Sequence, residues 1–147
     1  MPYYIKRKKK ASKRNGPDYT AQLDREFSLY IRLRDSKEFG GRAFRCISCG
    51  KIKPFEQADC GHYFSRRHMS TRFDEENCHA ECRYCNRFDA EHLENYRSNL
   101  IKKIGQKNFD LLSWRKNSVR TITACEYKIL IKHYKKLNKE MKESLNL

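Results

Sequence analysis

Apolar residues recur every three or four positions in several stretches of the chain, the spacing that places them on one face of a helix. The long stretches cover residues 20–37, 93–104 and 123–145, and a shorter one covers residues 106–117. Charged residues fill the intervening positions, so each stretch predicts an amphipathic helix with one buried face. Trp114, in the shorter stretch, is expected to anchor that helix in the core.

The middle of the chain follows a different pattern. Residues 42–51, RAFRCISCGK, indicate a short strand that runs into a tight turn, and residues 54–64 mix apolar and polar positions as a second strand or a hairpin does. The chain is therefore predicted to be α+β. Its parts are a disordered basic arm, an N-terminal helix, a core and a C-terminal helical region, over residues 1–17, 18–41, 42–105 and 106–147.

Positive charge is concentrated at the two ends of the chain. The formal charge is +15; residues 1–17 hold seven Lys or Arg and no acidic residue, and residues 97–147 hold thirteen against four acids. Basic arms beside a nearly neutral centre indicate a polyanion partner, and we expect DNA, bound through its phosphates.

Membrane and secretory segments are not expected. No stretch approaches the roughly 20 apolar residues that cross a bilayer, and no apolar segment of a secretory signal follows the basic N-terminus. The expected location is therefore a reducing cytoplasm, where paired cysteines bind metal more often than they form disulfides.

Four of the seven cysteines form two C-x-x-C pairs, Cys46–Cys49 and Cys82–Cys85, which are 32 residues apart. Each pair can form a tight turn that presents two thiolates to one tetrahedral ion, so the pattern predicts one structural Zn²⁺ per chain. Four thiolates leave no open position on the ion, which therefore does no chemistry. The remaining cysteines are interpreted as buried free thiols: Cys60, Cys78 and Cys125.

Between the two pairs lie residues that a zinc-stapled binding protein does not need. His62 follows a predicted strand, and a neutral imidazole suits a general base that activates water. Asn77 could orient that ring through a hydrogen bond. Asp59 and Asn86 offer oxygen ligands to a hydrated Mg²⁺ ion, which stabilises the charge that develops in phosphodiester hydrolysis.

The order of strand, histidine, loop, asparagine, C-x-x-C and a polar residue opening a helix resembles the HNH, or ββα-metal, nuclease motif, here with Asn86 as the third motif residue. Residues 44–116, which include DCGHYFSRRHMSTRFDEENCHAECRYCNRF, are similar to the lambdoid phage NinG (Rap) recombination proteins. The resemblance implies a zinc-stapled ββα-metal core that cuts branched DNA such as Holliday junctions in phage recombination, in the bacterial host cytoplasm. It also implies that His62 is the general base and that Asn86 binds catalytic Mg²⁺ or Mn²⁺.

One detail departs from that motif. An acidic ligand often directly precedes the histidine, but here Gly61 does, and Asp59 lies three residues before His62. On a straight strand these two side chains face opposite sides, unless a bulge at Gly61 brings them together. His68 and His79 are alternative metal ligands, although each has an ordinary interpretation as a loop or surface histidine.

Three arginines in the loop after the histidine, Arg66, Arg67 and Arg72, are expected to grip phosphates beside the scissile bond. The alternative is that they are simply solvated. No base-reading element is evident, which favours recognition of DNA shape. Charge and zinc fit a non-catalytic DNA-binding protein equally well. Cutting both strands of a junction requires two active sites, so we expect a homodimer, with the last helix as its surface.

Overall fold

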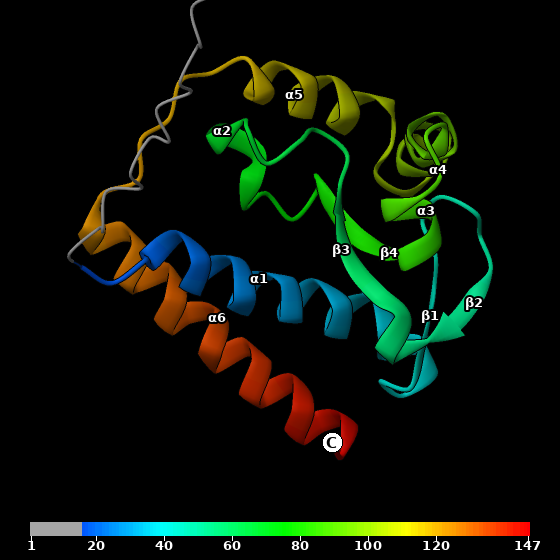
Figure 1. Cartoon of the computed structure of the whole chain (residues 1–147), viewed down its shortest axis with the longest axis horizontal. Coiled ribbons are helices and arrows are strands. Elements are labelled where there is room, and N and C mark those ends of the chain that lie inside the picture. Colours follow the sequence, from blue (N-terminus) through cyan, green and yellow to red (C-terminus); the bar gives the residue numbers. More distant parts are fainter. Residues whose placement is uncertain (1–15) are drawn as a thin grey trace, which may run out of the picture.

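A computed structural model describes residues 16–147 of the protein (Figure 1). The predicted disordered arm lies almost entirely outside these residues. The α+β class is confirmed. The elements, in chain order, are α1 (Tyr19–Ser36), a 3-10 turn (Lys37–Phe39), β1 (Ala43–Arg45), β2 (Ile52–Pro54), a second 3-10 turn (Phe55–Gln57), β3 (Ala58–His62), α2 (Met69–Arg72), β4 (Cys78–Cys82), α3 (Arg83–Arg87), α4 (His92–Ile104), α5 (Gln106–Lys116) and α6 (Ala124–Leu145).

The first and last helices pack along each other (Figure 1). Leu23, Phe27 and Ile31 of α1 form one core cluster with Ile131 and Tyr134 of α6. Burying each such side chain stabilises the fold by about 1.5–3 kcal/mol, which is why two segments a hundred residues apart come together. The apolar face of α6 is thus occupied within the chain, so the surface that we expected to form a dimer is already covered by α1.

A central hairpin of β3 and β4 lies between α1 and the α4–α5 pair (Figure 1). The two strands are antiparallel and pair without interruption from Ala58 opposite Cys82 to His62 opposite Cys78. The register is regular, so Gly61 forms no bulge. Because side chains alternate along a strand, Asp59 and Gly61 face one side of the hairpin, while Cys60 and His62 face the other.

Gly61 is instead required for close packing. A Cβ atom added there would lie 2.8 Å from Cβ of Glu81, whose side chain covers the glycine from β4. β4 was not recognised in the sequence because CHAEC is short and buried on both faces, so it shows no polar alternation.

Another core cluster joins the hairpin region to α4 and α5, with Tyr96, Leu100, Phe109 and Leu112 at its centre. The prediction that Trp114 anchors α5 was wrong, since its side chain is 70% exposed. Phe109 and Leu112 are three residues apart and share one face, and Trp114, two residues further on, lies on the opposite side of the helix. No helix in residues 16–147 has the length and apolarity needed to cross a membrane.

Candidate active site and cysteine cluster

The four cysteines of the two C-x-x-C pairs come together in one place. We call Cys46, Cys49, Cys82 and Cys85 the cysteine cluster; their sulfur atoms all lie within 4.8 Å of one another. Sγ of Cys49 and Sγ of Cys82 are 4.0 Å apart. A tetrahedral zinc ion with Zn–S bonds of about 2.3 Å separates its sulfur ligands by about 3.8 Å, so the cluster fits that ion.

Local backbone geometry presents these thiols to one point. The first pair closes a turn in which the Gly50 amide donates to the Cys46 carbonyl at 2.9 Å, and Gly50 has the left-handed φ of 70° that favours glycine. Burial raises the pKa of the Cys46 thiol to about 11, and burial also raises the pKa of the Cys85 thiol above its ordinary value. A metal ion must therefore displace protons that these thiols hold firmly, and its binding is coupled to folding.

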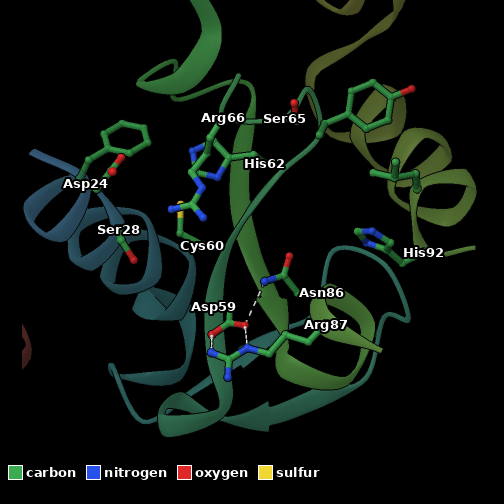
Figure 2. A pocket seen from close by; sticks show the side chains of 13 residues that line it. Asp24, Ser28, Asp59, Cys60, His62, Ser65, Arg66, Asn86, Arg87 and His92 are labelled. Carbon is green, nitrogen blue, oxygen red and sulfur yellow. Dashed lines mark hydrogen bonds and ion pairs between the residues drawn. The ribbon is translucent and has the colours of Figure 1, made fainter. Parts of the chain in front are cut away.

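A second feature is an open cleft of about 610 Å³ along β3, which we call the β3 cleft (Figure 2). Polar groups from five parts of the chain line it. Asp59 and His62 face opposite sides of the hairpin, yet both line the cleft. The polar lining includes Asp24 from α1, Asp59 and His62 from β3, Arg66 from the following loop, Asn86 and Arg87 from α3, and His92 from α4.

The side chains of Asp59 and Asn86 meet in this cleft. Nδ2 of Asn86 donates to Oδ2 of Asp59 at 2.9 Å, and Arg87 holds both carboxylate oxygens at 2.7 and 2.8 Å (Figure 2). Burial alone would raise the pKa of Asp59, but the hydrogen bonds from Arg87 and Asn86 outweigh it and leave the pKa below its ordinary value. The carboxylate is therefore ionised at neutral pH. With the Asn86 amide turned, its oxygen and that of Asp59 would form a two-ligand site for a hydrated Mg²⁺ ion.

The ring of His62 is held by a hydrogen bond from one of its two nitrogens. Nε2 lies 2.9 Å from the carbonyl oxygen of Arg72, which can only accept, so Nε2 carries the proton and Nδ1 carries the lone pair. Burial lowers the pKa of His62 below its ordinary value, in spite of the hydrogen bond to Arg72. The ring is therefore neutral at physiological pH, the state that a general base requires.

Asn77 does not orient this ring as expected. It is fully buried, and its side chain bonds the backbone of the loop between β3 and β4: it accepts from Phe64 N–H at 2.8 Å and donates to the carbonyls of Phe64 and Thr71. The Arg72 carbonyl takes the place that we assigned to Asn77. Because Asn77 fixes the loop that supplies this carbonyl, its effect on His62 is indirect.

The three loop arginines are placed differently from one another. Arg66 lines the β3 cleft, and both Arg66 and Arg67 are exposed and accessible to a phosphate. Arg72 instead forms an ion pair with Asp24 of α1, with Nε 3.0 Å from Oδ1. That pair fastens the loop to α1, so Arg72 has a structural partner where we expected a phosphate contact.

Neither alternative histidine ligand lines the cleft. His68 precedes α2, and His79 lies opposite Gly61 on the face of the hairpin that carries Asp59, buried against Tyr96 of α4. Burial lowers the pKa of His79 to about 3, so this ring is a neutral core residue.

His92 is a cleft residue that the sequence did not reveal. Its Nδ1 lies 2.6 Å from Oε1 of Glu81, a fully buried carboxylate that also accepts from Ser48 Oγ at 2.5 Å. With Nδ1 donating to the carboxylate, Nε2 is the nitrogen left for the cleft. In the sequence, the only indication of this pair was Glu81, an acidic residue inside a buried strand. His92 lies eleven positions after it.

Comparison with known proteins identifies the family to which the chain belongs. Residues 3–144 match the family described as Bacteriophage Lambda NinG protein. The chain belongs to the NinG family. Protein ninG of Escherichia phage 933W is 35% identical over 125 residues, protein ninG of Escherichia phage lambda is 34% identical over 125 residues, and protein ninG of Salmonella phage P22 is 32% identical over 124 residues.

The match covers 84% of this chain in each case but only 57–58% of the ninG proteins, so the chain spans somewhat more than half the length of these curated relatives. The NinG match includes both C-x-x-C pairs and the segment between them, which extends the resemblance noted above to nearly the full chain. No match was found among solved protein structures.

Proposed function

We propose that this NinG-family protein is a metal-dependent endonuclease that hydrolyses phosphodiester bonds in branched DNA, including Holliday junctions. The observation that carries the proposal is the convergence of Asp59, Asn86 and His62 on one cleft. Two oxygen ligands and a neutral imidazole that line the same cleft are the groups that water activation at a phosphate requires. They lie on a β-hairpin followed by a helix, which supports an HNH-like site.

In this mechanism His62 accepts a proton from the attacking water at Nδ1. The Arg72 carbonyl fixes the ring by holding Nε2–H, so the basic nitrogen is the same one in every turnover. The buried position keeps the ring unprotonated until the water gives up its proton.

Asp59 and Asn86 are the residues that would hold the catalytic ion. A bound Mg²⁺ or Mn²⁺ supplies positive charge to the reacting phosphate and to the leaving oxygen. Before metal enters, Arg87 neutralises Asp59 through the two hydrogen bonds described above. Since Arg87 is half exposed, it can turn to solvent or to a DNA phosphate when the ion takes its place.

His92 is placed to serve the other end of the reaction. Glu81 fixes its ring through Nδ1–H, and in the doubly protonated ring Nε2–H could give its proton to the leaving oxygen. A carbonyl holds His62 through Nε2, and a carboxylate holds His92 through Nδ1. These different environments suit the two rings to opposite roles in proton transfer, His62 as the base and His92 as the acid.

DNA is expected to lie across the mouth of the β3 cleft, with Arg66 and Arg67 on its phosphates and the basic ends of the chain along its flanks. Two cuts in one junction call for two copies of the chain, and a homodimer in the host cytoplasm remains our expectation. The face of α6 that packs on α1 is not available for it.

The first test is purified protein with Mg²⁺ or Mn²⁺ on four-way, flapped and linear duplex DNA. The proposal predicts metal-dependent cleavage, with branched DNA preferred. A protein that binds junctions and never cuts them under either metal would instead be the zinc-stapled, non-catalytic DNA-binding protein that charge and zinc alone also allow.

A further inference from the structure

Three metal-ligating side chains outside the cysteine cluster also come together. One ligand atom from each of Cys60, His62 and Cys78 lies within 4.8 Å of the other two. The strand register explains why. Cys60 and His62 are two residues apart on β3 and share a face, and Cys78 is directly opposite His62 on β4. The backbone pairing of the hairpin therefore fixes all three positions.

The surroundings of this trio are those of metal ligands. A metal-bound histidine usually donates its second N–H to a carbonyl or carboxylate, and Nε2 of His62 already donates to the Arg72 carbonyl. The Cys78 thiol donates to the same carbonyl at 3.7 Å, a hydrogen bond that a Zn–S bond would replace, and Nδ2 of Asn77 donates to that sulfur at 3.9 Å. The amide would donate to a thiolate as it does to the thiol.

The trio is reachable from solvent. Cys60 and His62 line the β3 cleft, whereas Cys78 is fully buried behind them. Two thiolates would balance the charge of a divalent ion, and soft sulfur with imidazole nitrogen selects Zn²⁺ over Mg²⁺. Three protein ligands with one open position form a zinc site that an external molecule can reach, unlike the closed set of four thiolates in the cysteine cluster.

We propose that Cys60, His62 and Cys78 form a second zinc site, with its open position facing the β3 cleft. Binding forms one Zn–N and two Zn–S bonds and releases the two thiol protons to solvent, so affinity rises with pH.

Because Nε2 donates to the Arg72 carbonyl, zinc at this site would take Nδ1 of His62. This consequence rests on the proposed function, in which the same lone pair is the general base. Excess Zn²⁺ should therefore stop cleavage even at saturating Mg²⁺, because it removes the base and leaves Asp59 and Asn86 untouched. The occupation of the site itself does not depend on the protein being a nuclease.

The deciding experiment is zinc stoichiometry of the full chain after saturation and gel filtration. Wild type should retain two Zn²⁺ per chain and Cys60→Ser should retain one. Cys125→Ser, which alters an exposed cysteine outside both groups, should still retain two. Cys60 is the better choice for substitution because it is half-buried, while Cys78→Ser alters the core.

Cobalt(II) titration gives a second readout, since each site that contains thiolate contributes its own charge-transfer absorbance as it fills. A wild type that retains one ion at saturation, or a Cys60→Ser variant that retains two, would overturn the proposal. In a cleavage assay micromolar Zn²⁺ should inhibit wild type and not Cys60→Ser. If wild type never cuts DNA, the proposed function fails while the stoichiometry still decides whether the site exists.

Discussion

The cysteine cluster and the β3 cleft differ in the kind of donors that they bring together and in how closed they are. The cluster gathers four thiols, three of them buried, and leaves no position for a substrate. The cleft gathers two carboxylates, an amide and two histidines around an open space. Identical soft donors suit an ion that holds the fold, whereas mixed hard donors and imidazoles suit an ion and proton transfers that act on phosphate.

The two regions are mechanically connected. Cys82 ends β4, Cys85 lies in α3, and Asn86 follows Cys85 directly, so the cluster positions one wall of the cleft. The comparison therefore predicts two kinds of mutant: substitutions in the cluster should destroy the fold, and substitutions in the cleft should leave the fold intact and affect chemistry alone.

The largest effect is expected from Cys82→Ser. Structural zinc contributes apparent binding free energies of about 10–16 kcal/mol at pH 7, more than a small domain has to spare, so the variant should be unfolded or insoluble. Circular dichroism and elemental analysis measure this, with Cys125→Ser as the matched control. A well-folded Cys82→Ser protein that contains no zinc would contradict the structural role of the cluster.

The cluster could be predicted from the sequence and the cleft only in part, for a physical reason. Two C-x-x-C turns are local, so spacing alone specifies the ligands. The cleft depends on which face of β3 each residue occupies and on Asp24 and His92 from distant helices. The sequence could not reveal that β4 pairs with β3 in a regular register, nor that Asn77 bonds the loop backbone while a carbonyl holds His62.

The next effect in size concerns the metal ligands of the cleft. Asn86→Ala removes one proposed ligand, and a bound ion is worth several kcal/mol to the transition state, so cleavage at low Mg²⁺ should fall by about 10³-fold. Raised Mg²⁺ should recover part of it, and Asn86→Asp, which keeps an oxygen ligand, should recover more. Cleavage rates against Mg²⁺ concentration measure this. Equal rates for Asn86→Ala and wild type at low Mg²⁺ would remove Asn86 from the site.

A smaller loss is expected for His92→Gln, about 10²-fold, the lower end of what general acid–base catalysis contributes. Glu81→Gln should act through His92 by loosening the ring, so it should lower the rate less and shift the pH profile. Single-turnover rates across pH test both variants. Junction affinity should not change, and if it falls as far as the rate does, His92 binds DNA and does not transfer a proton.

The smallest effect on chemistry is expected from deleting residues 1–14. They carry seven Lys or Arg residues, so their loss should weaken DNA binding and flatten the dependence of log affinity on log salt by up to about six. Cleavage at saturating protein should continue. Binding measured between 50 and 200 mM salt, about the range where counterion release dominates, tests this. An unchanged slope would mean that these residues do not contact DNA.

The most direct test of the central claim is the cleavage rate of His62→Ala on a four-way junction, beside His133→Ala, which alters an exposed histidine of α6. His62→Ala should lose roughly 10²–10⁴-fold in rate while the zinc of the cysteine cluster, folding and junction affinity are retained, and Mg²⁺ should not rescue it. Because the pKa of His62 lies below its ordinary value, wild-type cleavage should hold from neutral pH down through about 6.5 and decline only as the ring protonates at lower pH. Equal rates for His62→Ala, His133→Ala and wild type, or no metal-dependent cleavage by wild type, would contradict the account.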